Sequence, residues 1–254
     1  MNTKTILART GEWQTRRTGK NQTTGLKSVD EGIAMLISGL FSNVLLVDPR
    51  PEEKRFASFL GRSPADRVFV GRYDGAIEFL KAIRRANAGQ GRMPTSQEIN
   101  RDALPAINIS RSMDISYDNN DHQMDRRIGA WFHDPDSGMP LANLEYIQAI
   151  LTYDVTLIAT DKDTLSLMCN ALGAQIRLMM GTQFEAQTSL VRVPVSLICA
   201  IQDAKEIGFS DVSAPMNEER IYAVQAPVTV NAEVITAWEV DANRVTTETS
   251  LSMG

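Results

Sequence analysis

The sequence predicts an α+β fold: a mixed, mainly antiparallel sheet with two or three helices packed on one face, plus extended terminal arms. The first observation is that segments alternating with a period of two outnumber segments with a helical period. The second is that helical segments stand between strands at only a few places, whereas a doubly wound parallel sheet alternates strand and helix throughout. The third is that both ends of the chain are polar and lack a sustained period.

Residues 1–25, MNTKTILARTGEWQTRRTGKNQTTG, are polar and basic. They hold too few apolar side chains to build a core, so we predict a flexible basic arm that orders on a partner. The stretch GKNQTT does not form a phosphate-binding loop, because Asn21 follows Lys20 where such a loop carries Ser or Thr.

Residues 26–240 are predicted to form a single α+β domain, which begins with a helix and two short strands. The helix is indicated by apolar residues at helical spacing between Leu26 and Phe41. NVLLV (43–47) predicts a strand that two following prolines stop, and RVFV (67–70) predicts another. A second helix is expected after Asp74-Gly75, with one apolar face made of Ile77, Leu80 and Ile83.

LPAINISRSMDISYD, residues 104–118, alternates between apolar and polar side chains and predicts a longer strand. One face, interrupted by Arg111, is expected to carry Ile107, Ile109, Met113, Ile115 and Tyr117. Residues 119–140 are predicted to be a loop or an extended hairpin tip.

A strand predicted from Asn143 to Thr160 leads directly into a helix, and Asp161 and Asp163 stand at the joint. A carboxylate at the start of a helix accepts backbone N–H bonds and lies at the positive end of the helix dipole. We therefore interpret both residues as helix caps and not as catalytic groups.

Two further strands and a tail complete the chain. LVRVPVSLICAI (190–201) predicts a strand with one apolar side from Val191 to Ile201. ERIYAVQAPVTVNAEVITAWEV (219–240) predicts a long last strand with a possible break at Pro227, and residues 241–254 a polar C-terminal tail. Long strands leave edges that need covering, often by another subunit.

Composition narrows the class of protein. The net charge of −5 argues against a dedicated nucleic-acid binder with a basic face. Cys169 and Cys199 lie in apolar periodic segments, which indicates buried free thiols. No apolar run approaches the ~20 residues that span a bilayer, so we expect no membrane contact.

The motifs of enzymes and metal sites are missing from the sequence. HDPDSG (133–138) groups metal-capable residues, but its dipeptides are ordinary turn formers. His122 and His133 are the two histidines, and neither has cysteine ligands at zinc spacing. There is no Gly-x-Ser-x-Gly elbow and no Gly-x-Gly-x-x-Gly turn after a strand. We expect no enzyme, no cofactor and no metal.

Three arginine pairs are candidate interface residues: Arg16 and Arg17, Arg84 and Arg85, and Arg126 and Arg127. Most paired arginines are solvated surface, but the planar guanidinium also suits phosphate or the acidic surface of a neighbour.

Several segments, in their order, resemble the tail terminator proteins of contractile-tailed bacteriophages, also called tail-sheath stabilisers. They are GLFSNVLLV, RVFVGRYDGAIEFLKAI, LPAINISRSMDISYDNN, YDVTLIATDKDTLSLMCNALGAQI, VRVPVSLICAIQDA and ERIYAVQAPVTVNAEV. The best single motif is Leu104-Pro105-x-Ile107 followed by Asp114-Ile115-Ser116-Tyr117-Asp118. The resemblance covers roughly Leu40 to Val240, so the basic arm inherits nothing from it.

The resemblance implies a structural protein of the virion, made in the host cytoplasm and placed in the tail–neck region. Such proteins form a ring, commonly a hexamer, that caps the tail tube and sheath proteins, ends tail growth and meets the head–neck connector protein. Double-stranded DNA passes through the channel without specific binding. Two other hypotheses stay open: another tail or neck component, such as a baseplate or connector-completion protein, and an enzyme with an unrecognised site.

Overall fold

The computed structural model describes residues 5–70, 78–79, 81, 104–118, 131–134, 136–178, 183–202, 206–216 and 219–252. The α+β class and the mainly antiparallel sheet are confirmed. The described residues hold four α-helices, which is more than the two or three expected: α1 (Lys27–Ser42), α2 (Lys54–Leu60), α3 (Pro64–Arg67) and α5 (Lys162–Leu178). A short 3₁₀ helix, η1, spans Pro51–Glu53.

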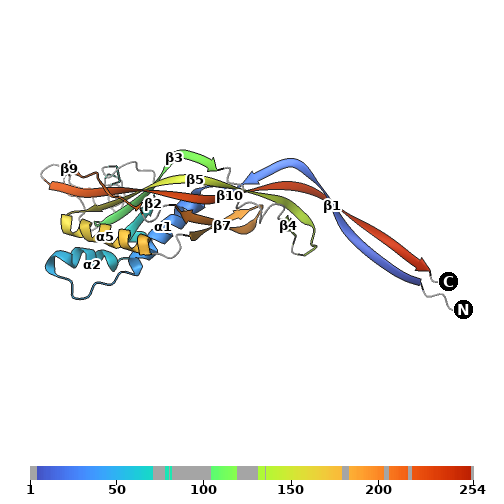
Figure 1. Ribbon diagram of the computed structural model, residues 1–254, viewed down its shortest axis with the longest axis horizontal. Helices are drawn as coiled ribbons and strands as arrows, with labels where there is room; N and C mark the ends of the chain where they lie inside the picture. The colour runs from blue at the N-terminus through green and yellow to red at the C-terminus, as the bar shows by residue number, and fades with distance from the viewer. Residues whose placement is uncertain are drawn as a thin grey trace, which may run out of the picture.

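One large curled sheet organises the chain (Figure 1). Its main path is β2-β3-β5-β10-β7-β6, with β1, β8 and β9 added to β10 and β4 added to β5. Among the described strands, β2 and β3 form the one parallel pair. The strands are β1 (Thr5–Thr23), β2 (Val68–Val70), β3 (Ala106–Asp118), β4 (Trp131–His133), β5 (Pro140–Ala159), β6 (Gln183–Leu190), β7 (Val193–Ile201), β8 (Ser210–Asp211), β9 (Ala214–Met216) and β10 (Glu219–Ser252).

The core lies between the sheet and the helices, which stand on one side of the long strands in Figure 1. Helix α1 packs closely on β6 at Gly32. A side chain there would be crowded, because a Cβ atom would lie 3.0 Å from the ring of Phe184. Helix α5 turns Leu165, Met168 and Leu172 toward the same core.

A polar cluster ties α1 to the sheet. The Asp30 carboxylate accepts a hydrogen bond from Arg111 Nε at 2.9 Å and from the Tyr153 hydroxyl at 2.8 Å. Tyr153 is fully buried, and burial together with the Asp30 carboxylate raises its pKa far above the usual value. Arg111, which interrupts the apolar face of β3 in sequence, is therefore the partner of a helix acid.

The alternation of β3 breaks at a bulge. Its register with β5 shifts between Arg111 and Ile115. Ile107 and Ile109 are buried, but Met113 is 84% exposed and Tyr117 is 60% exposed. The single apolar face predicted for this strand is therefore wrong at Met113, which lies in a stretch where β3 has two residues more than β5, and at the exposed Tyr117. Ile115, after the bulge, packs against the core again.

One predicted strand is absent from the structure, and another begins later than predicted. NVLLV forms no strand: Val44 and Leu46 pack against the core, while Leu45 and Val47 are exposed. In LVRVPVSLICAI, the first residues belong to a tight turn. Val191 and Arg192 have φ angles of 50° and 65°, which suit the two-residue turn of a hairpin. That turn joins β7 to β6, a strand that sequence alternation did not reveal.

Strand β10 does not break at Pro227, which lies opposite Asp154 of β5 in a continuous register. The backbone of Ala223, Thr229 and Ile235, at every second position, bonds on the side of β10 away from β5. Pro227 shares that orientation, and it falls between the residues paired with β8 and with β7. Its missing N–H therefore removes no described ladder bond.

The structure places most of the predicted flexible arm at 1–25 and of the predicted polar tail at 241–254 in strands, which the sequence analysis did not expect. Residues 5–23 form β1, and β10 continues to Ser252. The two ends pair with each other in an antiparallel ladder from Thr5↔Ser252 to Thr23↔Thr236. Their partners are too far apart in the sequence for local pattern to reveal them. The helix expected after Asp74-Gly75 lies almost wholly outside the described residues.

We predict that the Asp30 cluster contributes strongly to stability. Asp30→Ala should lower the free energy of unfolding by about 2–4 kcal/mol, because it leaves Arg111 and the buried Tyr153 hydroxyl without their acceptor. Tyr153→Phe should lower it by only about 1–2 kcal/mol, because Asp30 keeps Arg111. Urea denaturation measures both values. Equal effects of the two substitutions would contradict this ranking.

Candidate functional site

The most distinctive feature of the described chain is a two-stranded ribbon, made by β1 and residues 236–252 of β10. We call it the terminal ribbon. It extends away from the body, and both ends of the chain lie at its tip (Figure 1). Beyond Val240, neither strand pairs with any other described strand. Twelve residues of β1, Thr5–Arg16, belong to this outer part, which spans roughly 40 Å at strand rise.

The ribbon kinks where it leaves the body. The register of β1 against β10 shifts between Arg17 and Asn21. Within this bulge Gly19 has a φ of 89°, a conformation that glycine adopts without strain. The Thr18 hydroxyl donates to Glu239 Oε2 at 2.8 Å, and Lys20 Nζ lies 3.9 Å from the same oxygen.

Four polar and aromatic side chains fix the ribbon to the body, and we call them the base cluster. Arg17 Nη2 donates to Asn143 Oδ1 and, at 2.8 Å, to Glu145 Oε1. Trp238 Nε1 donates to the other Glu145 oxygen at 2.7 Å. The Arg17 guanidinium lies over the Trp238 ring, 5.3 Å from its centroid. The base cluster thus joins β1, β5 and β10.

The carboxylate of Glu145 is the centre of this cluster. Burial alone would raise its pKa, but the hydrogen bonds from Trp238 and Arg17 more than offset burial, and the pKa is lowered. Glu145 therefore stays charged at neutral pH. Because the Arg17 and Glu145 side chains are about half exposed, their ion pair orients the ribbon more than it stabilises the fold.

The structure places the predicted interface arginines in different situations. Arg17 belongs to the base cluster, whereas Arg16 is exposed on the ribbon, opposite Asp241. Arg84, Arg85, Arg126 and Arg127 lie outside the described residues, as does His122. Further out on the ribbon, Arg244 lies over the Trp13 ring, 5.9 Å from its centroid.

The two aspartates at the start of α5 differ in role. Asp161 Oδ1 accepts the Thr164 backbone N–H at 2.8 Å, the bond of a helix cap. Its other oxygen accepts from Arg55 Nη1 at 2.9 Å. Burial alone would raise the pKa of Asp161, but these bonds more than offset it and the pKa is lowered. Asp163 lies inside the first turn of α5, at the positive end of the helix dipole.

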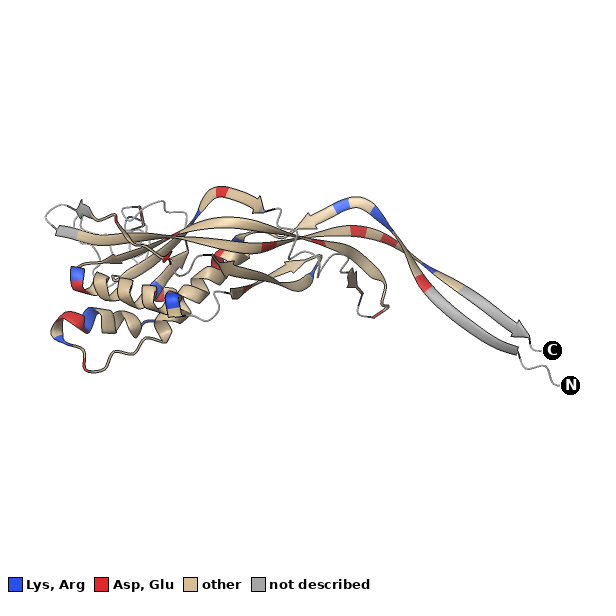
Figure 2. Cartoon of the chain, viewed as in Figure 1, with Lys and Arg blue, Asp and Glu red and all other residues tan. Residues whose placement is uncertain are grey.

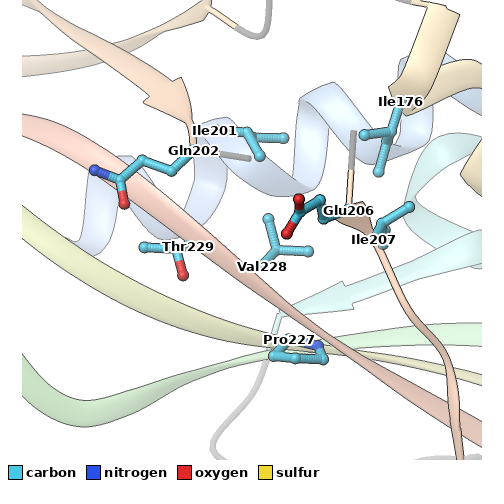
Figure 3. Close-up of a pocket in the computed structure, with 8 residues that line it drawn as sticks. All are labelled: Ile176, Ile201, Gln202, Glu206, Ile207, Pro227, Val228 and Thr229. Carbon is cyan, nitrogen blue, oxygen red and sulfur yellow. The ribbon is translucent and has the colours of Figure 1, made fainter. Parts of the chain in front are cut away.

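The one pocket described is small and has no catalytic pattern. It has a volume of about 160 Å³ and lies beside β10, between the end of α5 and the segment after β7 (Figure 3). Five of its eight lining residues are apolar, and the full set is Ile176, Ile201, Gln202, Glu206, Ile207, Pro227, Val228 and Thr229. Glu206 is the only ionisable side chain in this lining, so the pocket offers no acid–base or nucleophile pair.

Metal and membrane features are likewise missing from the part of the chain that the structure describes. It contains no group of three or more His, Cys, Asp and Glu side chains able to hold a metal ion. The HDPDSG segment there forms a turn before β5, in which Asp134 accepts hydrogen bonds from Ser137. No described helix is long and apolar enough to cross a membrane.

Comparison with known proteins identifies no family: no family model matches the sequence, and no curated protein matches it.

Sequence reasoning missed Asn143, Glu145 and Trp238 as ribbon contacts. Each lies in a segment predicted as strand, and a strand pattern says which face a side chain is on but not what crosses it. The sequence held one signal for these contacts. Glu145 and Trp238 can each interact with an arginine, and Arg17 lies in the basic segment at the start of the chain. The register that brings the three together comes from pairing across the sheet.

We predict that Glu145→Ala opens the ribbon without unfolding the body. It removes the acceptor of both Arg17 and Trp238, so trypsin should cleave after Arg16 and Arg17 several-fold faster. The melting temperature should fall by little, because an exposed ion pair contributes less than about 1 kcal/mol. Glu185→Ala, which removes an exposed acceptor of β6, is the matched control. Unchanged cleavage in Glu145→Ala would show that the cluster does not hold the ribbon.

The aspartates at α5 give a second prediction. Asp161→Ala should lower the free energy of unfolding by about 1 kcal/mol, and Asp163→Ala by less, because only Asp161 makes the capping bond. Since the folded-state pKa of Asp161 is lowered, its contribution is present above pH ~4 and is lost as the pH falls further. Thermal denaturation at pH 7 and pH 3 measures both. A larger effect of Asp163→Ala would reverse the assignment.

Proposed function

We propose that this chain is a structural protein of the neck of a contractile phage tail. In this role, copies form a closed ring, most simply a hexamer, that caps the tail tube and sheath. The ring ends tail growth and meets the head–neck connector. The proposal joins the resemblance of the sequence to tail terminator proteins with the physical features of the described chain.

The observation that carries the proposal is the terminal ribbon. An isolated two-stranded ribbon is at best marginally stable in water, because it has no core and both outer edges are unpaired. Among the side chains of the outer ribbon that the structure describes, those of residues 12–16 and 241–246, none belongs to the buried core. A long, exposed extension of this kind is expected where a protein reaches over a neighbour in an assembly.

Most of the segments that carry the resemblance contain strands of the body, although GLFSNVLLV ends α1 and forms no strand. RVFV contains β2, LPAINIS opens β3, YDVTLIA ends β5, VRVPVSLICAI contains β7 and ERIYAV opens β10. The segment after YDVTLIAT is α5, with its acidic cap at Asp161. The resemblance therefore concerns the body, whereas the ribbon is a feature of this chain.

The chemistry of the described residues favours a structural role over catalysis. The pocket has no pair of reactive groups, and the acids whose pKa is lowered, Asp134, Glu145 and Asp161, serve structural contacts. The net charge of −5 suits a ring through which DNA must pass, since a basic lining would hold phosphate groups.

Electron cryo-microscopy of purified tails tests the proposal. We expect this chain at the head-proximal end of the tail, as a closed ring around the tube and in contact with the last sheath layer. A single copy, a location at the baseplate, or a lack of rotational symmetry would contradict the proposal. A location at the baseplate would support the second hypothesis, a different tail component.

We predict that the ribbon is needed for capping and not for folding. Removing residues 1–15 and 243–254 together should shift the melting temperature by only a few degrees, because the backbone of this part of the ribbon pairs with no described strand of the body. The same truncation should abolish the capping of polymerising tubes, measured as tail length by negative-stain microscopy. The full chain is the control. Truncated protein that still limits tail length to the full-chain value would contradict the assignment of the ribbon.

A further inference from the structure

The two strands of the terminal ribbon carry opposite charge. Between residues 5 and 23, β1 has four basic residues and one acidic residue, a net charge of +3. Between residues 236 and 252, β10 has three acidic residues and one basic residue, a net charge of −2. Where side chains are described, Figure 2 shows basic positions on β1 and acidic ones on β10 near the base. The ribbon therefore has a basic strand and an acidic strand.

The register places the backbone positions of basic and acidic residues opposite each other within the ribbon. Arg16 pairs with Asp241, and Arg9 pairs with Glu248. Directly opposed charges of unlike sign favour the pairing of two strands. The same charges can also interact with a further strand that pairs along the outer edge of β1 or of β10, because each strand would then have one neighbour on each side.

Both outer edges of the ribbon are unpaired within the described chain. Strand β1 pairs with β10 alone, and the pairing of β10 with β5 ends at Glu239↔Ala142. The outer edge of β1 and the outer edge of residues 240–252 each present a row of backbone N–H and C=O groups. Such edges are templates for further strands.

We propose that the terminal ribbons of neighbouring copies pair edge to edge, with the basic β1 of one copy against the acidic β10 of the next. The ribbons together then form a closed sheet around the ring axis, to which each copy adds two strands. The inference rests on the proposed ring and names the contact that closes it.

Strand direction agrees with this arrangement. Within one copy, β1 and β10 are antiparallel. Copies related by rotation about a common axis hold their ribbons in the same direction along that axis. The β1 strand of one copy is therefore antiparallel to the β10 strand of the next, so every neighbour in the closed sheet is antiparallel.

The charges also select a ring over a two-fold dimer. A two-fold axis would bring β1 against β1 or β10 against β10, and in each case like charges would face each other. Pairing β1 with β10 of the next copy joins unlike charges at each contact, and this head-to-tail contact is the kind that generates rings.

The side chains suit a wall with water on both sides. Over the positions whose side chains are described, one face of the outer ribbon carries Glu12 with Val245, Gln14 with Asn243 and Arg16 with Asp241. The other face carries Thr15 with Ala242 and Trp13 with Arg244. At these positions neither face is an apolar surface that needs a core, whereas the backbone groups on both outer edges still lack partner strands among the described residues.

Charge exchange between the strands tests the proposal in the full chain. The first variant, Arg9→Glu with Arg16→Glu, makes both strands acidic. The second, Asp241→Arg with Glu248→Arg, makes both basic. The third combines all four substitutions, which keeps both opposed pairs within the ribbon but exchanges the two strands. Arg17 is left unchanged because it belongs to the base cluster, and unchanged melting of the body checks the fold of each variant.

Native mass spectrometry of rings assembled on short tail tubes at low salt gives the readout. We expect each two-substitution variant alone to form at least tenfold fewer rings than the natural chain, and a mixture of the two to restore them. The fourfold variant should form rings with itself, but at least tenfold fewer mixed rings with an isotope-labelled natural chain, because like charges then meet at every mixed contact. Raising the salt should weaken this discrimination.

The outcomes separate the inference from the proposed function. If the fourfold variant mixes freely with the natural chain, the charges act only within each ribbon. The proposed edge-to-edge contact would then be wrong, but the proposed ring would not be contradicted. If every variant forms as many rings as the natural chain does, the edge-to-edge contact is likewise contradicted. A natural chain that forms no closed ring on tubes would overturn the proposed function itself.

Discussion

The backbone ladder along β10 is the constraint on which the rest of the structure depends. This strand runs from Glu219 to Ser252 and pairs with β5 without interruption over Tyr222–Glu239. Its opposite side is shared by β8, β7 and β1 in succession. One strand therefore lies at the centre of the core and also forms half of the terminal ribbon. The direction in which the ribbon leaves the body is set by the sheet, because the strand that enters the ribbon cannot turn without breaking its ladder with β5.

Two polar clusters complete what the ladder begins. The Asp30 cluster ties helix α1 to β3 and β5, which holds the helical layer on the sheet. The base cluster around Glu145 ties β1 to β5 and β10 at the point where the ribbon leaves the body. Both use a carboxylate that accepts from an arginine and from an aromatic side chain. In each case the acid and its two donors come from elements far apart in the sequence, so the contacts fix tertiary arrangement and not local structure.

The sequence alone predicts the elements whose pattern depends on their own side chains. The α+β class, the strand that becomes β5, the body part of β10 and the cap at Asp161 are of this kind, because burial alternation and helix starts are local. The errors share one cause, which is pairing at a distance. Strands β1 and β6 are polar and become strands because a distant partner offers a ladder, while NVLLV is apolar but finds no partner strand. Of the arginines predicted as candidate interface residues, Arg16 and Arg17 lie in the ribbon, but Glu145 and Trp238 required the register of three strands.

A ribbon that is incomplete in one copy and complete between copies is the central claim of this account. Amide hydrogen exchange along β1 and the end of β10 tests it most directly, in the free protein and in protein assembled on tails. The account predicts slow exchange at residues 20–23 and 236–240 in both samples, because the base belongs to the sheet of the body. It predicts fast exchange at residues 5–16 and 241–252 in the free protein and slow exchange after assembly. Equal exchange of the outer ribbon in the two samples would contradict the claim.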